Sequence, residues 1–196
     1  MNRLITYATT NPGKVASLRR HLEGYGIDVL QEPLSIPEPR SDDVREIAEH
    51  KVRYAYGRLQ RPVVVLDAGF YIDALNGFPR AFVNFALETI GLDGILKLVD
   101  GKPRACEFRE CLAYMGGELE TPRYFIGHVR GTIAPEKRGQ KQPHLWSDLG
   151  LIYIPENHTR TLAELTGQEY REWSGNKSTP ESASRQFGEW YDSNGR

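Results

Sequence analysis

The chain has 196 residues and a formal net charge of −1, because 25 lysines and arginines stand against 26 aspartates and glutamates. This balance leaves no excess positive charge to displace counterions from phosphates, which argues against a nucleic acid or a membrane surface as partner. Hydrophobic residues make up 39% of the chain and charged residues 26%, a composition typical of a globular protein with a filled core. The length predicts one domain, or two tightly joined lobes.

The cysteine content and the lack of long apolar runs indicate where in the cell the protein is located. Cys106 and Cys111 lie five positions apart in a predicted strand, so they would face opposite sides of it and are expected to be free thiols in a reducing compartment. No apolar run approaches the ~18–20 residues of a membrane span, and no signal-peptide pattern follows Met1. We expect a cytoplasmic protein.

The first third of the chain alternates predicted strands and helices. In chain order the elements are a strand over 4–8, a helix over 15–22, a strand over 27–30, a helix over 41–60 and a strand over 63–66. Each helix has apolar residues at helical spacing on one stripe, such as Val15, Leu18 and Leu22 in the first. Ser41 or Asp42 is the expected N-cap of the second helix, and Pro62 ends it. The continuous apolar run over 63–66 is typical of a strand covered on both faces.

The remainder adds a hairpin to this pattern. Short helices are predicted over 82–90 and 95–99, two long strands over 105–114 and 123–132, a strand over 151–155 and a last helix over 181–191. Gly116 and Gly117 mark the turn of an antiparallel hairpin that spans about 104–132. Strands mixed with helices in this way predict an α/β protein with a mixed sheet.

The turn that follows the first strand is a candidate anion site. Thr9, Thr10 and Asn11 offer short polar side chains, and Lys14 adds a positive charge. Backbone amides at a strand-to-helix turn favour an anion, and the helix dipole adds to this. The turn lacks the spacing of a Walker motif, and the same residues are typical of an ordinary helix cap.

Two carboxylates are candidates for metal binding. Asp67 follows the apolar strand where ligands gather in open α/β sheets, and it could bind Mg²⁺ or act as a base on water. Glu46 lies beside the apolar stripe of the helix over 41–60. A turn aspartate bonded to its own backbone and a solvated helical glutamate are the alternatives. The five histidines show no spacing typical of zinc ligands.

Five ordered sequence blocks resemble the inosine triphosphate pyrophosphatase family, and its archaeal-type members most. They are Thr9-Thr10-Asn11-Pro12-Gly13-Lys14, Glu46-Ile47-Ala48-Glu49, Val65-Leu66-Asp67-Ala68-Gly69-Phe70, Ala74-Leu75-Asn76-Gly77-Phe78-Pro79 and Glu88-Thr89-Ile90-Gly91. The similarity continues to about Gln168. It implies one domain over 1–196, with an elongated mixed sheet flanked by helices, two lobes and a central nucleotide-binding cleft.

The resemblance also implies an activity and a set of roles. The family hydrolyses nucleoside triphosphates of deaminated purines, such as inosine and xanthosine, to the monophosphate and pyrophosphate with Mg²⁺, often as a homodimer. By position, Thr9, Asn11 and Lys14 would hold phosphates and Glu46 would bind the metal, while Asp67 would orient or deprotonate the attacking water. Thr10 belongs to the same phosphate-binding turn.

The chain departs from the family pattern around the reacting phosphates. Where the family has two acidic residues before a Ser/Thr-Gly turn, this chain has Leu66-Asp67-Ala68. One carboxylate and one hydroxyl are therefore missing. Arg80 stands where the family has a glycine, and it is a candidate for binding substrate.

The positions that would recognise the base also differ. The family's aromatic and acidic segment appears here as Leu145-Trp146-Ser147-Asp148-Leu149-Gly150, which makes Trp146 and Asp148 candidates, although Gly150 can also be aligned with the family aspartate. The family's Ser-His-Arg clamp appears as Ser174-Gly175-Asn176. Ser174 remains a candidate, and Arg80, Arg171 or Lys177 could replace the missing cations.

Two classes of function follow from these matches and losses. In the first the chain is a Mg²⁺-dependent nucleoside triphosphate pyrophosphatase with altered base recognition. In the second it is a catalytically impaired relative that binds a nucleotide or a protein. Because Lys14, Glu46 and Asp67 are retained together, the enzyme is favoured: a binding module has no need of metal carboxylates.

Overall fold

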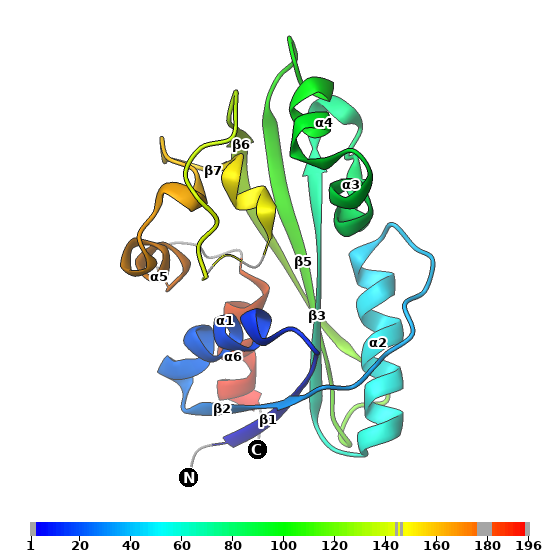
Figure 1. Cartoon of the computed structure of the whole chain (residues 1–196). Coiled ribbons are helices and arrows are strands. Elements are labelled where there is room, and N and C mark those ends of the chain that lie inside the picture. The colour runs from blue at the N-terminus through cyan, green and yellow to red at the C-terminus, as the bar shows by residue number, and fades with distance from the viewer. Residues whose placement is uncertain (1–2, 144, 146, 176–181, 195–196) are drawn as a thin grey trace. The chain divides into compact units, whose positions relative to one another are not determined.

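The computed structural model describes residues 3–143, 145, 147–175 and 182–194 (Figure 1). The chain forms two compact units. The first unit comprises residues 1–68, 110–127 and 180–196, and the second comprises 69–109 and 128–179. Strands β3 (Val63–Ile72), β5 (Ala105–Met115) and β6 (Arg123–Ile133) run through both units. The strand order β2-β1-β3-β5-β6-β7, with β4 beside β3, confirms the predicted mixed α/β sheet.

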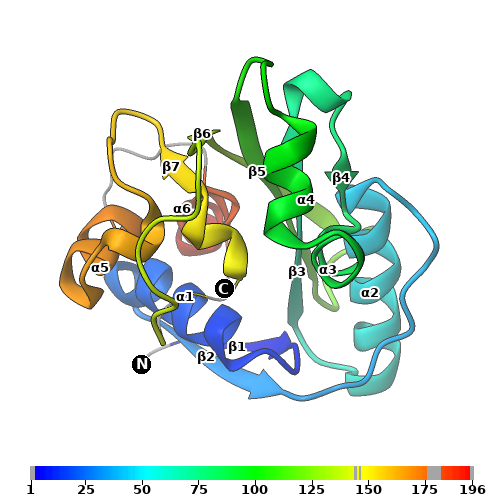
Figure 2. The same ribbon diagram turned by 45° about the horizontal axis from the view of Figure 1, so that its top comes forward.

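In the first unit the strands pair in parallel. β1 (Arg3–Ala8) pairs with β2 (Ile27–Glu32), from Arg3 opposite Ile27 to Ala8 opposite Glu32, and also with the start of β3. Parallel neighbours need crossover connections, and α1 (Pro12–Leu22) and α2 (Val44–Leu59) provide them. The two helices lie on opposite sides of β3 (Figures 1 and 2).

The core of the first unit confirms the predicted helical stripes. Val15, Leu18 and Leu22 of α1 are buried, and α1 packs against α6 (Ala183–Asn194). In α2 the buried side chains are Val44, Ile47, Ala48, Val52 and Ala55. A spacing of three and four residues therefore places one apolar face of each helix on the sheet.

The start of α2 corrects the predicted cap. The helix begins at Val44, and its N-cap is Asp43, whose Oδ1 accepts a hydrogen bond from the Arg45 amide at 2.7 Å. Ser41 is not the cap, because its Oγ accepts from the Asp43 amide at 3.1 Å. Asp42 is not the cap either. Short polar side chains such as Ser41 and Asp43 can each accept a hydrogen bond from a nearby backbone amide. The helix starts after Asp43, the last of them.

The second unit is built on the far part of β3. β4 (Pro79–Arg80) pairs antiparallel with it, with Phe70 opposite Arg80. A Cβ on Gly69 would lie 2.7 Å from the Arg80 carbonyl oxygen, so this approach requires glycine. β3 thus continues to Ile72, well beyond the predicted end at residue 66.

Short helices complete the second unit. These are η2 (Asp73–Leu75), α3 (Val83–Thr89), α4 (Gly91–Leu98), η3 (Asp148–Leu151), η4 (Leu162–Glu164) and α5 (Gly167–Gly175). β7 (Tyr153–Pro155) pairs antiparallel with β6, so the predicted strand over 151–155 is shorter and follows a helical turn. The rings of Phe70, Phe108 and Tyr153 pack together in this core, with centroids 4.8 to 6.2 Å apart.

None of the helices that the structure describes is long and apolar enough to cross a membrane.

Both cysteines are free and buried. Burial raises the pKa of the Cys111 thiol to about 12 and raises that of Cys106 far above its usual range. A thiol reacts as its thiolate. We therefore expect Ellman's reagent at about pH 8 to label neither cysteine in the folded protein, and both after denaturation. Fast labelling of either one under native conditions would contradict this burial.

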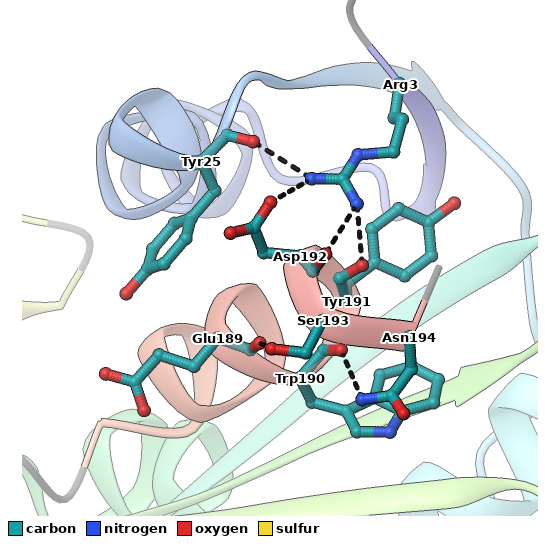
Figure 3. Close-up of polar contacts among 8 residues, drawn as sticks. All are labelled: Arg3, Tyr25, Glu189, Trp190, Tyr191, Asp192, Ser193 and Asn194. Carbon is teal, nitrogen blue, oxygen red and sulfur yellow. Dashed lines mark hydrogen bonds and ion pairs between the residues drawn. The ribbon is translucent and has the colours of Figure 1, made fainter. Parts of the chain in front are cut away.

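Arg3 ties the beginning of the chain to the end of α6, as Figure 3 shows. Its guanidinium donates to the carbonyl oxygens of Tyr191 at 2.8 Å and Asp192 at 3.2 Å, and to that of Tyr25 at 3.2 Å. It also pairs with the Asp192 carboxylate. The last carbonyls of a helix have no partner within the helix, so Arg3 satisfies groups that would otherwise need water.

We predict that Arg3→Ala lowers the free energy of unfolding by about 1–3 kcal/mol, because several hydrogen bonds to a charged donor are lost. Asp192→Asn should cost less than about 1 kcal/mol, since it removes only an exposed ion pair. Urea unfolding of both variants tests this. Equal losses would show that the ion pair, and not the capping of carbonyls, carries the contribution.

Candidate functional site

The turn before α1 is held by its own polar side chains. Asn11 is the N-cap of α1, and its Oδ1 accepts from the amides of Gly13 at 2.9 Å and Lys14 at 3.2 Å. The Asn11 amide in turn donates to Thr9 Oγ1 at 3.2 Å. Thr10 is exposed beside them. The capping alternative is thus realised for Asn11, and the same bonds fix the turn in which phosphate binding is predicted.

Lys14 extends from the first turn of α1 to strand β3. Its Nζ donates to the carbonyl oxygen of Leu66 at 2.9 Å. Burial lowers the pKa of Lys14, and the negative charge of Asp67 offsets part of this effect. The structure therefore brings the two predicted catalytic residues, Lys14 and Asp67, into one electrostatic environment.

Asp67 is buried in β3, with 8% of its surface exposed, and forms an ion pair. Its Oδ1 accepts from Lys51 Nζ at 2.7 Å, while its Oδ2 is buried without a hydrogen-bond partner among the described residues. Lys51 also pairs with Glu38. Burial alone would lower the pKa of Lys51, but the two carboxylates raise it above its usual range. The charged Lys51 thus lies next to the Asp67 carboxylate, one oxygen of which has no hydrogen-bond partner among the described residues.

Lys51 is the site residue that the sequence reasoning missed. It lies four residues after Ile47 and four before Ala55, both of which are buried in α2. Positions four apart share one face of a helix. The signal was therefore a lysine inside an apolar stripe, which has to be paired if it is buried.

Glu46 does not join this buried cluster through any described contact. It is exposed in the first turn of α2, and its Oε2 accepts from Ser41 Oγ at 2.7 Å. Among the described residues, no group of three or more histidine, cysteine, aspartate or glutamate side chains is arranged to hold a metal. The metal pair of Glu46 and Asp67 stays a prediction.

The predicted substrate-binding residues of the second unit have local partners. Arg80 has a φ of 55°, and its Nη2 donates to the Asn76 carbonyl oxygen at 3.2 Å. Asp148 pairs with Lys141 at 2.7 Å. Ser174 donates to the Arg171 carbonyl oxygen at 3.3 Å. Two further predicted residues, Trp146 and Lys177, lie outside the described residues. The binding roles of all five stay predictions.

A separate cavity of about 450 Å³ lies in the second unit. Cys106, Arg130 and His158 are among the residues that line it. None of the predicted site residues does, so the cavity is not the predicted site.

Comparison with known proteins identifies relatives over nearly the whole chain. The model of the Ham1 family matches residues 5–184. A dITP/XTP pyrophosphatase of Thermococcus kodakarensis is 36% identical over 193 residues, which are 97% of this chain and 98% of that protein. A dITP/XTP pyrophosphatase of Methanopyrus kandleri is 38% identical over 193 residues, with 97% of each chain covered.

Solved structures support the same fold. A HAM1 protein from Coxiella burnetii has a TM-score of 0.78 at 23% identity, and covers 95% of this chain and 97% of its own. The Ham1 protein of Staphylococcus aureus has a TM-score of 0.77 at 21% identity, and covers 97% and 99%. At these identities the likeness shows the fold alone.

The buried ion pair leads to a prediction about stability. Lys51→Met leaves Asp67 buried without its cation, so we expect a loss of about 3 kcal/mol in the free energy of unfolding. Lys137→Met is the matched control, because Lys137 pairs with Asp93 at 2.8 Å but both side chains are exposed. The control should lose less than about 1 kcal/mol in the same urea titration. Equal losses would contradict a role for burial.

Proposed function

This chain belongs to the Ham1 family, and on that premise we propose that it hydrolyses nucleoside triphosphates to the monophosphate and pyrophosphate. The names of its relatives make dITP and XTP the first substrates to consider. One observation supports the proposal most: Asp67 is buried beside two lysines, and one of its carboxylate oxygens has no partner among the described residues.

The charges of this cluster suit a reaction at phosphorus. Lys14 and Lys51 offer positive charge to the phosphates, as does the amide-rich turn over 9–14. Asp67 Oδ2, which has no hydrogen-bond partner in the described part of the chain, is available to orient a water molecule or to accept its proton. Attack by that water on the α-phosphorus would break the α–β anhydride bond and release pyrophosphate.

We further propose that Glu46 and Asp67 hold a divalent cation, with Mg²⁺ the first choice. The donor set fits, because carboxylate oxygens are hard ligands and one buried oxygen of Asp67 has no partner among the residues that the structure describes. When bound, the cation would neutralise charge that develops on the phosphates. The Glu46 carboxylate would then bind the cation and also accept the hydrogen bond from Ser41 Oγ, which donates to Glu46 Oε2 at 2.7 Å.

Base recognition is expected to differ from the family pattern. The positions that carry it would be Arg80, Trp146 and Asp148, with Ser174 and Lys177 in place of the missing clamp. Selectivity of this kind depends on polar groups that are paired by one base and left unpaired by another. We therefore propose altered selectivity among purines. A homodimer and a cytoplasmic location stay predictions.

Pyrophosphate release from a panel of nucleotides tests the activity. We expect release from at least one nucleotide of a panel that contains dITP, XTP, ITP, ATP and GTP, and we expect EDTA to abolish it. Asp67→Asn should reduce kcat/KM by about 10²–10⁴, the effect of removing a group that acts on the reacting water. Asp28→Asn is the matched control, because Asp28 is exposed on β2.

The same panel distinguishes the alternative function. A protein that is stabilised by nucleotides in thermal unfolding but releases no pyrophosphate from any of them would be a binding relative. That outcome would contradict the proposed hydrolysis.

A further inference from the structure

The segment that connects β2 to α2 brings polar side chains to the proposed site. This connecting segment, residues 33–43, contains three prolines, which favour an extended course. It runs beside α2 to the start of that helix (Figures 1 and 2). It belongs to the first unit, as do Lys14, Lys51 and Asp67. Two of its side chains contact residues that the proposed function uses.

Glu38 of the connecting segment forms an ion pair with Lys51. The Lys51 ammonium has three N–H donors. One donates to Asp67 Oδ1 at 2.7 Å and another donates to Glu38 Oε1. The charge of Glu38 also acts on Lys14. Glu38 therefore reduces the positive charge that the two lysines offer to phosphates.

The two carboxylates that contact Lys51 differ in how firmly they are held. The Asp67 side chain is 12% exposed, whereas the Glu38 side chain is 71% exposed. Breaking a buried ion pair leaves an uncompensated charge and is costly. An exposed carboxylate is hydrated when it leaves its partner, so such pairs contribute little to stability. A competing anion would therefore replace Glu38 and leave Asp67 in place.

A phosphate group is an anion of the right chemistry. Its oxygens accept charge-assisted hydrogen bonds from an ammonium, as a carboxylate does. A triphosphate also carries several negative charges where Glu38 carries one. The exchange of one acceptor for the other would keep Lys51 paired throughout.

A second contact of the connecting segment follows the same pattern. Ser41 Oγ donates to Glu46 Oε2 at 2.7 Å, and this hydrogen bond is exposed. Glu46 is the carboxylate proposed above to hold the cation. The connecting segment thus contacts one group proposed for phosphate and one proposed for metal, each through an exposed interaction.

We propose that Glu38 competes with substrate phosphate for Lys51, and that a bound phosphate displaces Glu38 and with it the connecting segment. This inference rests on the proposed function. It makes the connecting segment an internal competitor of the substrate, which sets how tightly phosphates bind.

Calorimetric titration with inorganic pyrophosphate tests this competition without turnover. We expect Glu38→Gln to bind pyrophosphate about two- to fivefold more tightly, the range that corresponds to an exposed ion pair. Because Glu38 is exposed, the variant is expected to fold. Unchanged or weaker binding, or no binding to either protein, would overturn the proposal. Weaker binding in particular would mean that Glu38 holds Lys51 in position for the anion.

A matched variant controls for the loss of one negative charge. Glu189→Gln removes the carboxylate that pairs with Arg185 at 2.9 Å on α6, in the same unit. At an ionic strength of about 0.15 M, exposed charges more than roughly 8 Å apart are largely screened. Glu189→Gln should therefore bind pyrophosphate like the unmutated protein. An equal gain in both variants would show a general effect of charge and would overturn the proposal.

Hydrogen exchange measured by mass spectrometry tests the displacement itself. Pyrophosphate should slow exchange in the turn over 9–14, where it is proposed to bind, and speed exchange in the connecting segment as Glu38 leaves Lys51. Slower exchange in the connecting segment would mean that it closes over the anion, which contradicts displacement.

Pyrophosphate release from nucleotides keeps the two proposals apart. If the unmutated protein releases pyrophosphate and Glu38→Gln binds it no more tightly, only the role of Glu38 fails. If no nucleotide is hydrolysed, the proposed function fails, while tighter binding in Glu38→Gln would still show that Glu38 competes with phosphates.

Discussion

The ion pair between Lys51 and Asp67 is the constraint on which the polar interior of the first unit depends. Lys51 Nζ and Asp67 Oδ1 are 2.7 Å apart, and both side chains are nearly buried. Either charge alone would be strongly unfavourable there, so α2 and β3 have to pack with these two residues in register. Lys14 is a neighbour of the same pair, and the charge of Asp67 opposes the lowering of its pKa by burial. The arrangement keeps two ammonium groups inside a protein of almost neutral net charge.

The sequence predicted those parts of the fold that local patterns determine. Apolar residues three and four positions apart identified the buried faces of α1 and α2, and the valine run identified β3. Boundaries were less certain, because they depend on distant partners. β3 continues past Asp67 because β4 pairs with it where Gly69 allows a close approach. The α2 cap was misplaced because several adjacent side chains could fill that role.

The site was predicted in part, for related reasons. Lys14 follows a recognisable polar turn and Asp67 follows an apolar run, and the structure places the two residues in one electrostatic environment. Lys51 was missed because a lysine in an apolar stripe is usually read as a side chain that extends to water.

The two units separate the residues proposed for chemistry from those proposed for selectivity. Lys14, Lys51 and Asp67 all belong to the first unit, whereas Arg80, Asp148 and Ser174 belong to the second. Every nucleoside triphosphate presents the same phosphates to the first group, while only the base distinguishes one substrate from another. Substitutions in the second unit can therefore change which nucleotide binds without removing the charges that act on phosphorus. If the proposed roles are correct, the departure from the family's Ser-His-Arg clamp would affect substrate choice before it affects the hydrolytic step.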